Sequence, residues 1–563
     1  MSTMHDPPSN TALSRRGFLK AAALSGAGLA GATMLGGCAP ATSSSNSSAT
    51  SGDDLAATGE PSFLTAPASI DADEIAETVD TDVLVIGSGI AGAITASSCT
   101  EQGLKVFLVE KAEAPRNIGL DYGFVNPGIM AEKNIEPVDV YEVVRDHMEK
   151  SCHRCRGDKV YRFMSESGAA GDWYLEKARG YGFVPEVIAM KSNSDHFKNY
   201  VHVVELWPDE GAVADDGDWY AATKAMIANL QQEVVSGGGE YRNLTEAVQL
   251  LVDGGRVTGA ICKGENGYLQ VNAAKGVVLA CGDYAADPEM LDYYTAWDFD
   301  SFDPDFFINE STGTGDGHKM GLWAGAAMQP GPHPLMTFMA YAYSYLRVNN
   351  LGQRYVNEDA GYTGGGNAQL IQPAAASWAI WDDKWREELP NQMPYAGGMS
   401  WDQDGRRIQD PWTPEGEEEL AFSWEIEDGL LVQANSLEEL ANVMGLAPEA
   451  IETFLATVKR YNELVDAGDT DFGKRPELMA KIEQPPFYGL RMNVELGVSV
   501  SGLITNADSE CLTEAGAVIP GLYAVGNNAG GLFGIDYNEV TIPGISLGRC
   551  VTFGWLLGQH LAK

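Results

Sequence analysis

The clearest hydrophobic pattern in the chain lies between Asp82 and Glu110. Residues Asp82 to Ile86 form a short apolar run rich in β-branched side chains, the composition of a buried parallel strand. A glycine-rich turn at 87–92 follows at once, and then an alanine-rich segment with helical spacing. A second apolar run, Lys105 to Val109, ends in an acid. The pattern predicts a strand–turn–helix–strand unit.

The turn in this unit has the chemistry of a dinucleotide site. Gly87 suits the tight turn, Gly89 lets backbone approach a pyrophosphate, and Gly92 lets the helix pack closely on the strand. Ile90 and Ala91 begin the helix, whose N-terminus directs unpaired N–H groups and the positive end of its dipole at the phosphates. We therefore expect these five residues to contact the cofactor.

The acid that ends the second strand makes the motif more specific. Glu110 lies eighteen residues after Gly92, where a carboxylate can accept hydrogen bonds from both hydroxyls of an adenosine ribose. A glycine-rich turn that binds nothing would not account for this acid. The sequence therefore predicts a dinucleotide site.

Later segments favour a flavin over a nicotinamide. Asn243 to Gly264 has the pattern of a β-meander with a tight turn, and 275–284 that of a strand running into the turn at Gly282. The segment 314–321 opens a helix with Asp316 in its first turn. Near the C-terminus, 521–528 is another strand that ends in glycine, and a last helix is expected to begin near Pro543.

The first 38 residues are expected to be an export signal and not part of the fold. Ser14 to Lys20 resembles the twin-arginine motif, and the apolar run that follows is too short and glycine-rich for a transmembrane helix. Leu35 to Cys38 resembles a lipobox, and a Ser-rich linker is expected over 39–78. We favour a lipid-anchored protein, and the alternative is a soluble secreted protein with an incidental Cys38.

Composition bounds the remaining possibilities. The chain has 563 residues, 44% of them hydrophobic and 21% charged, so it is long enough for two or more globular domains. Its formal net charge of −42 disfavours nucleic acid and anionic lipid surfaces as partners. This charge suits either a basic partner or simply a well-solvated surface.

The eight cysteines do not form the pattern of a disulfide framework. Cys38 belongs to the lipobox. Four further cysteines lie in apolar contexts typical of core thiols, namely Cys99, Cys262, Cys281 and Cys550. Cys152 and Cys155 form a CxxC that lacks the histidine of a haem attachment site, and no second CxxC completes a zinc or iron–sulfur set. A disulfide, two free thiols and part of a distant cluster remain open, and no metal site is predicted.

The order of these motifs resembles the flavoprotein subunits of the fumarate reductase and succinate dehydrogenase family. This family includes soluble fumarate reductases, urocanate reductase, ketosteroid dehydrogenases and exported reductases of anaerobic gut bacteria. The resemblance runs from about residue 80 to the end of the chain. It implies an α/β fold with a doubly wound FAD-binding domain built from 79–330 and 498–563, and an inserted α+β capping domain over 331–497.

The resemblance also implies which residues contact FAD. Beyond the first glycine turn and Glu110, it adds Lys111, backbone at Val248 near the adenine, and Gly282, Asp316, Gly526, Asn527, Ser546 and Leu547. Ser546 and Leu547 would present the final helix N-terminus to the pyrimidine carbonyl of the flavin. Asn527 stands where the family usually has Glu. No histidine lies in 117–123, so we expect FAD to be bound non-covalently.

The active-site residues of fumarate reductases are largely replaced. Gly352 to Glu358 matches a landmark of the family's cap, and the proton-donor Arg expected eight residues beyond Arg354 is Tyr362. The position of a second proton-path Arg, thirteen residues back, is Tyr341. The family's substrate-binding His and Arg fall in 496–502 and 535–539, which contain neither histidine nor cation.

His333 and Tyr537 complete the candidate catalytic set with the two tyrosines above. His333-Pro334 matches the family's His-Pro at the start of the cap, and motif spacing places Tyr537 over the flavin. An anionic substrate held without cations would pay a large desolvation cost. The resemblance and these replacements predict reduction of an activated C=C bond in a neutral, hydrophobic, steroid-like or aromatic substrate, with a tyrosine as proton donor.

Other functions remain open. The same site could dehydrogenate a saturated ring ketone, reduce a small unsaturated carboxylate such as fumarate or urocanate, or belong to a non-catalytic electron-relay flavoprotein. No second GxGxxG suggests a nicotinamide site. We therefore expect electrons to come from an external membrane or surface redox protein, such as a cytochrome or a quinol-linked carrier.

Overall fold

The structure is a computed structural model that describes residues 61–117, 119–188, 200, 202–208, 220–339, 344–359, 361–392, 429–537 and 541–563. Glu60 to Lys563 form one compact unit. The predicted export signal, the lipobox and most of the predicted linker lie outside the described residues. In the described part of the chain, no helix combines the length and apolar character needed to span a bilayer.

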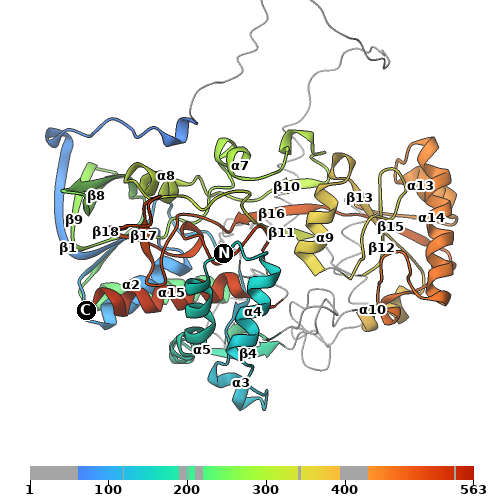
Figure 1. Cartoon of the computed structure of the whole chain (residues 1–563), viewed down its shortest axis with the longest axis horizontal. Coiled ribbons are helices and arrows are strands. Elements are labelled where there is room, and N and C mark those ends of the chain that lie inside the picture. Colours follow the sequence, from blue (N-terminus) through green and yellow to red (C-terminus); the bar gives the residue numbers. More distant parts are fainter. Residues whose placement is uncertain are drawn as a thin grey trace, which may run out of the picture. The chain divides into compact units, whose positions relative to one another are not determined.

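An eight-stranded sheet forms the centre of the cofactor-binding part (Figure 1). The order along its main path is β17-β18-β9-β1-β2-β6, and β7 and β8 extend it as a meander from β9. Its strands are β1 (Ile75–Ile86), β2 (Val106–Val109), β6 (Glu240–Arg242), β7 (Glu246–Asp253), β8 (Arg256–Gly264), β9 (Gly267–Leu279), β17 (Glu510–Leu512) and β18 (Val518–Ala524). β1 is parallel to β2 and β9, and β9 is parallel to β18.

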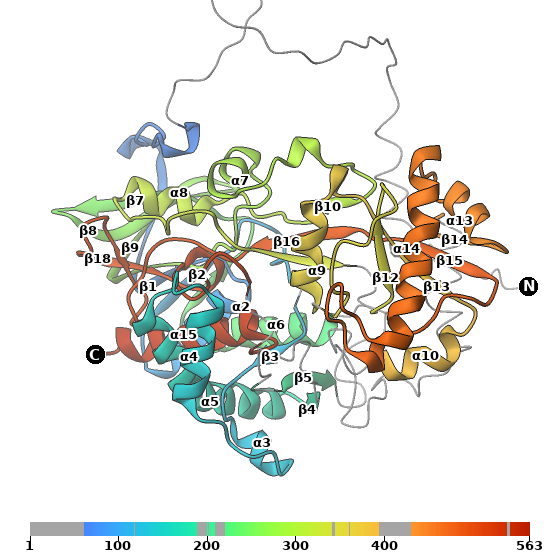
Figure 2. The ribbon, with the colours of Figure 1, turned by 45° about the vertical axis from the view of Figure 1, so that its right-hand side comes forward.

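The apolar run of β1 is buried on both faces of the sheet. Val83 and Val85 belong to one core cluster, and Leu84 and Ile86 belong to the cluster on the opposite face. Alternation of side chains along a strand explains this division. The first face is covered by α2 (Ile90–Glu101) and α15 (Ile545–Leu561), which lie side by side in Figures 1 and 2.

The first strand is longer than its hydrophobic pattern predicts. β1 begins at Ile75, inside the range expected to be linker, and its polar first half pairs with β9. Before it, η1 (Ser62–Leu64) and η2 (Ala72–Glu74) are short 3₁₀ turns. The carbonyl of Phe63 accepts a hydrogen bond of 2.9 Å from Trp323 Nε1, so the segment before β1 is attached to the domain.

Helices and a small sheet complete the cofactor-binding part. β3 (Tyr122–Gly123), β5 (Val203–Pro208) and β4 (Phe183–Ile188) form a three-stranded antiparallel sheet in the order β3-β5-β4. The helices are α3 (Gly128–Glu132), α4 (Val140–Lys150), α5 (Gly157–Gly180), α6 (Ala221–Ser236), α7 (Pro288–Tyr294) and α8 (Asp316–Trp323), with η3 at Phe299–Ser301 and η8 at Gly526–Asn528.

A second sheet lies in the region predicted to be the cap. It has the order β12-β13-β15-β14, with all neighbours antiparallel. The strands are β12 (Leu346–Asn349), β13 (Ser377–Asp382), β14 (Leu431–Ala434) and β15 (Phe487–Arg491), and the helices α10 (Trp385–Gln392), α13 (Leu437–Val443) and α14 (Pro448–Ala467). Figure 2 shows α13 and α14 beside this sheet. Short turns are η4 (Pro373–Ala375) and η7 (Pro476–Leu478).

A three-stranded sheet spans the predicted domain boundaries. β16 (Val494–Ser499) lies between β10 (Phe307–Asn309), to which it is parallel, and β11 (Leu335–Met339), to which it is antiparallel. Helix α9 (Gly361–Leu370) packs on this sheet, where a Cβ on Gly366 would lie 2.8 Å from Thr337 Oγ1. The sheet formed by β10, β16 and β11 therefore links the predicted cap to the cofactor-binding part.

Candidate functional site

The carboxyl ends of the parallel strands meet at one edge of the large sheet. Ile86 pairs with Val109 and with Leu279, and Leu279 pairs with Ala524, so the four strands end at the same level. The next residues along the chain, Gly87 among them, therefore share this edge. Doubly wound sheets bind their ligands at such an edge, where the strand order reverses.

The first glycine turn has the geometry that its sequence predicts. Gly87 has a φ of +95°, and a Cβ on it would lie 2.4 Å from the carbonyl oxygen of Ala280. A Cβ on Gly92 would lie 1.9 Å from the carbonyl oxygen of Gly87. A Cβ on Gly89 would meet no atom within 4 Å, so the space beside the α2 N-terminus is open. An open cradle lined by the unpaired N–H groups of a first helical turn fits a pyrophosphate.

Glu110 is fixed at the end of β2. It is 9% exposed, and its Oε2 accepts a hydrogen bond of 2.9 Å from the backbone N–H of Ser88, while Oε1 accepts one of 3.1 Å from Ala112. These bonds orient the carboxylate on the strand edge beside the glycine turn. Oε2 also accepts a hydrogen bond of 3.3 Å from Ser88 Oγ, so the second acceptor site of Oε1 remains for the hydroxyls of a ribose.

Two predicted cofactor contacts, Lys111 and Asp316, are brought together although 205 positions separate them. Lys111 Nζ donates to Asp316 Oδ2 at 2.7 Å and to Thr314 Oγ1 at 2.8 Å. This ion pair joins the end of β2 to the start of α8. A Cβ on Gly282, which has a φ of +82°, would meet no atom within 4 Å, so further open space lies at the same edge.

The C-terminal glycine turn packs against the first one. A Cβ on Gly526 would lie 2.9 Å from the Cβ of Ala91, and η8 begins at this glycine. His318 holds the turn: its Nε2–H donates to the carbonyl of Asn527 at 3.1 Å, and its Nδ1 accepts from Asn528 Nδ2 at 3.2 Å. Burial lowers the pKa of His318 to about 4, so the ring is neutral.

The N-terminus of α15 is fixed against β3. Gly544 caps the helix with a φ of +73°, and its carbonyl accepts a hydrogen bond of 2.9 Å from the N–H of Gly123. The first turn of α15 carries Ser546 and Leu547, and Leu547 packs against Gly119. Val248 is the unpaired residue of a bulge in β7 between Ala247 and Gln249. The residues predicted to contact FAD therefore form an open glycine turn, a carboxylate and a second helix N-terminus, which fit a pyrophosphate, a ribose and a flavin.

The candidate catalytic segments also lie close together. Asp536 Oδ1 accepts a hydrogen bond of 2.8 Å from Asn367 Nδ2, which attaches the segment before Tyr537 to helix α9. Tyr537 is 4% exposed, and its ring packs edge-on against Phe533 with 5.2 Å between centroids. Tyr362 is the second residue of α9. Tyr341 lies outside the described residues.

His333 is enclosed in an aromatic cluster. Its Nε2–H donates to the carbonyl of Gln329 at 2.6 Å, and its Nδ1 accepts from the hydroxyl of Tyr284 at 2.6 Å. The ring stacks on Tyr294 with 4.7 Å between centroids, and burial lowers the pKa of His333 to about 4. A neutral ring with both nitrogens bonded orients Tyr284. A catalytic role for His333 stays a prediction.

Comparison with known proteins identifies the family. A family described as FAD binding domain matches residues 82–538 of the chain.

The chain belongs to this family.

Curated relatives of this flavoprotein align with most of its length. It is 26% identical over 520 residues to the vinyl phenol reductase of Lactiplantibacillus plantarum, covering 86% of this chain and 96% of the relative. It is 26% identical over 504 residues to the cytochrome fumarate reductase of Shewanella frigidimarina, covering 86% and 77%. It is 24% identical over 591 residues to the 3-oxosteroid 1-dehydrogenase of Mycobacterium tuberculosis, covering 85% and 98%.

Solved structures show the same fold. The 3-ketosteroid Δ1-dehydrogenase of Sterolibacterium denitrificans matches with a TM-score of 0.64 at 19% identity, covering 86% of this chain and 99% of that one. A flavocytochrome c3 fumarate reductase in its open conformation matches with a TM-score of 0.62 at 21% identity, covering 90% and 82%. The family resemblance and the α/β fold with a capping domain are confirmed. The protein is an FAD-dependent oxidoreductase of the fumarate reductase and ketosteroid dehydrogenase type.

Two cations near the flavoprotein's candidate active site were not predicted from sequence. Arg549 of α15 lies over the Phe533 ring, with its guanidinium carbon 4.8 Å from the centroid. Arg116 Nη1 donates to the carbonyl of Gly497 at 3.4 Å. The 535–539 segment itself contains no cation, but Arg549 lies over the ring of Phe533, two residues before it, and Arg116 contacts β16. Arg549 had a signal in the sequence, because it is a lone arginine in an otherwise apolar last helix.

The family landmark in the cap forms a buried ion cluster. Arg354 Nη2 donates to Glu358 Oε2 at 2.7 Å and to Asp469 Oδ2 at 2.8 Å. Lys474 Nζ lies 3.5 Å from the same Glu358 oxygen and donates to the hydroxyl of Tyr461 at 2.9 Å. These charges satisfy one another, so the landmark residues Arg354 and Glu358 stabilise the cap.

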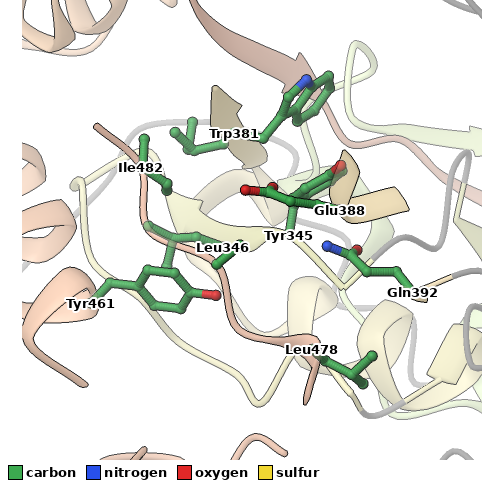
Figure 3. Close-up of a pocket in the computed structure, with 10 residues that line it drawn as sticks. Tyr345, Leu346, Trp381, Glu388, Gln392, Tyr461, Leu478 and Ile482 are labelled. Carbon is green, nitrogen blue, oxygen red and sulfur yellow. The ribbon is translucent and has the colours of Figure 1, made fainter. Parts of the chain in front are cut away.

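A small cavity lies beside this cluster (Figure 3). Its empty space of about 200 Å³ includes open solvent and has no room for a water molecule, and Glu388 and Tyr461 are among the residues that line it. Burial, followed by the charge of Asp382, raises the pKa of Glu388 to about 7. All lining residues belong to the predicted cap, so this cavity is separate from the strand edge that fits FAD.

The CxxC motif follows α4 in a tight turn. Cys152 and Cys155 are both free thiols, and Cys155 Sγ lies 3.3 Å from Met148 Sδ. Among the described residues, no group of three or more His, Cys, Asp or Glu could hold a metal ion. The predicted core thiols Cys99, Cys262 and Cys550 are buried, and Cys281 is half-buried.

Proposed function

We propose that this flavoprotein reduces an activated C=C bond in a neutral, largely apolar enone or vinyl aromatic substrate. The observation that carries the proposal is the bond between Asn367 and Asp536, which brings helix α9, the carrier of Tyr362, to the segment that holds Tyr537. The glycine turns and Glu110 would hold FAD non-covalently, and the bound cofactor would supply hydride chemistry at the β-carbon of the substrate.

The protein's own groups supply the proton. A phenol is protonated at neutral pH because its ordinary pKa is about 10, so Tyr537 or Tyr362 can donate a hydrogen bond or proton to the substrate oxygen or α-carbon. Backbone N–H groups can hold the developing enolate. Closure of the cap excludes water from this step.

Charge near Tyr537 supports a neutral substrate. Asp536 stands in the segment where the family has its substrate Arg, and burial raises the pKa of this carboxyl. Neither form of an aspartate binds a substrate carboxylate as a guanidinium does. Arg549 is 2% exposed and covered by Phe533, so it is not available to grip a substrate.

The relatives include proteins with neutral substrates, because the vinyl phenol reductase and the 3-oxosteroid dehydrogenase are named for phenols and steroids. The same site can run in the dehydrogenating direction, since direction follows the flavin potential and the electron partner.

A small unsaturated carboxylate is the second candidate substrate, and Arg116 favours it. Its guanidinium approaches β16 at Gly497, next to the segment where the family has its substrate His. Burial lowers the pKa of Arg116, and the charges of Asp283 and Glu310 oppose this change. Because these two acids partly balance the cation, we rank this candidate second.

We further propose that the protein is exported, lipid-anchored through Cys38, and reduced by an external redox protein such as a cytochrome. The twin-arginine-like segment and the lipobox support export and anchoring. The net charge of −42 suits a basic electron donor.

An anaerobic reoxidation screen tests the function. Protein reduced with viologen is mixed separately with neutral enones, vinyl phenols, aromatic acrylates and fumarate, and flavin absorbance is followed. We expect enones or vinyl phenols to reoxidise the flavin fastest. Fumarate as the fastest substrate, with loss of that activity in Arg116→Gln, would establish the second candidate instead. Reoxidation by one-electron acceptors alone would indicate an electron relay.

A further inference from the structure

Arg549 is a buried cation surrounded by neutral groups. It is 2% exposed on the second turn of α15, and its Nη1 donates to the carbonyl of Val500 at 3.2 Å. Its Nη2 donates to Asn527 Oδ1, and its guanidinium lies over the Phe533 ring. Among the described residues, no carboxylate forms an ion pair with it. A guanidinium stays protonated even when buried, so its charge remains in a region of low dielectric.

A second buried basic group lies nearby. Lys159 of α5 is 2% exposed, and its Nζ donates to Thr505 Oγ1 at 2.5 Å and to the carbonyl of Gly530 at 2.8 Å. Burial, followed by the positive charge of Arg549, lowers the pKa of Lys159 to about 7. Because the charge of Arg549 contributes to this shift in pKa, the two basic groups lie within electrostatic reach of each other. Uncompensated buried charge is costly, which points to a negative charge that is present only in a working state of the protein.

Asn527 connects Arg549 to the cofactor edge. Its Oδ1 accepts from Arg549, and its backbone carbonyl accepts from His318. The amide is thereby oriented with its two Nδ2–H donors directed away from Arg549. In the described part of the chain Nδ2 donates to no acceptor, and the residue is half-buried in the η8 turn. Where the resemblance leads one to expect a Glu acceptor, this chain presents donors backed by a cation.

We propose that Arg549, acting through Asn527, is a positioning residue that stabilises the negative charge of reduced flavin and so raises the reduction potential of the bound FAD. Arg549 lies two residues beyond Leu547, the backbone position expected to face the pyrimidine carbonyl. Uptake of two electrons and one proton at N5 converts FAD to its reduced anion, with the charge on N1 and the adjoining carbonyl. In the test, reduced viologen supplies the electrons.

This effect of Arg549 goes beyond the proposed function, because it holds for any substrate and for either direction of reaction. It also explains how a site without a substrate-facing arginine keeps a positive electrostatic potential at the flavin. The α15 N-terminus adds to this effect, since its dipole has the same sign.

The test uses the full chain loaded with FAD and two readouts that do not require turnover. The first is the midpoint potential, from viologen reduction against reference dyes. The second is the dissociation constant of sulfite, which adds to N5 and leaves the flavin with a negative charge at N1. Asn527→Glu places a carboxylate opposite the buried cation, Arg549→Met removes the cation, and Arg549→Lys retains it.

We expect Asn527→Glu and Arg549→Met to weaken sulfite binding about tenfold and to lower the potential by about 30 mV, the equivalent of tenfold for a two-electron couple. Arg549→Lys should have a sulfite dissociation constant and a midpoint potential close to those of the wild type. Arg460→Gln is the matched control, since Arg460 is half-exposed on the cap, and it should change neither.

An unchanged potential in Asn527→Glu, with FAD still bound, would overturn the proposal. If Arg549→Met loses FAD or fails to fold, Asn527→Glu and the milder Asn527→Asp decide the question. A change confined to the pH profile of turnover would also overturn it, because Arg549 would then act on Tyr537.

Discussion

The cofactor edge of the large sheet and the ion cluster of the cap bury polar groups in different ways. The cofactor edge is built mainly from glycines, backbone N–H groups and the neutral ring of His318. In the cap, Arg354, Glu358 and Lys474 are buried as charges that satisfy one another. The first arrangement leaves donors facing open space, whereas the second encloses its charges away from solvent.

This difference separates binding from support. An edge made of backbone and small residues has open space and unpaired donors, which a phosphate or a flavin can use. A closed ion cluster fixes the cap but offers no site to a substrate. Helix α9 and the 536–537 segment, which carry two of the candidate catalytic tyrosines, are joined by the hydrogen bond between Asn367 and Asp536.

The largest effect should come from adding one methyl group to the cofactor edge. In Gly92→Ala the new Cβ would lie 1.9 Å from the carbonyl oxygen of Gly87, a backbone atom that cannot move without opening the turn. We expect loss of bound FAD, measured as the ratio of flavin to protein absorbance. Gly180→Ala is the control, because a Cβ there meets no atom within 4 Å. Full FAD content in Gly92→Ala would show that the turn does not bind the cofactor.

A substitution in the ion cluster of the cap should lower the free energy of unfolding and leave the binding of FAD unchanged. Glu358→Gln leaves Arg354 and Lys474 without their shared carboxylate, and breaking a buried pair costs about 3–5 kcal/mol. Urea unfolding followed by tryptophan fluorescence measures this loss. Glu463→Gln removes an exposed partner of Arg460 and should cost at most about 1 kcal/mol. Equal losses in the two variants would contradict a structural role for the cluster.

Acid should destabilise the cofactor-binding part through its buried histidines. Burial lowers the pKa of His147, His318 and His333 to about 4 from an ordinary 6.5. The unfolded chain therefore binds more protons between these values, and stability falls as pH drops from 6.5 to 4 and is unaffected above 6.5. Each histidine accounts for about 3 kcal/mol across this window.

The histidine contribution can be isolated with a variant. Thermal unfolding of wild type and His318→Gln is compared between about pH 4 and about pH 7, because carboxylates titrate equally in both. The difference in stability between the wild type and His318→Gln should become smaller as the pH falls. Parallel curves would mean that folding does not shift the pKa of His318.

Tyr537→Phe should lower turnover about hundredfold, or about 2.7 kcal/mol in the barrier, because the hydroxyl is the proposed proton donor. FAD content and flavin potential should not change. Tyr362→Phe tests the other candidate donor, and Tyr141→Phe, on the exposed face of α4, is the control. Unchanged turnover in both active-site variants would remove tyrosine from the mechanism.

The elements that sequence predicts well are those encoded by neighbouring residues. The strand, glycine turn, helix and Glu110 follow one another within thirty residues, and the structure has them at one sheet edge. The final helix begins at Ile545, next to the predicted Pro543. The first half of β1 was not predicted, because its residues are polar and mostly exposed and are held by pairing with β9.

The contacts that assemble the candidate site join distant positions, and no local pattern predicts them. Asn367 and Asp536 are 169 positions apart, and His318 lies 210 positions from Asn528. Arg549 could be suspected as a lone charge in an apolar helix, but its bond to Asn527 depends on how η8 folds back on α15. Which cations surround the substrate is therefore a property of the fold and not of the 535–539 segment.

The charge preference of the substrate site can be measured most directly with a matched pair of substrates. An aromatic acrylate and its methyl ester carry the same C=C bond and differ in one negative charge. Anaerobic stopped-flow measurement of flavin reoxidation compares the two at equal concentration. We predict that the neutral ester reoxidises the flavin faster than the carboxylate does, and faster reoxidation by the carboxylate would contradict a site built for neutral substrates.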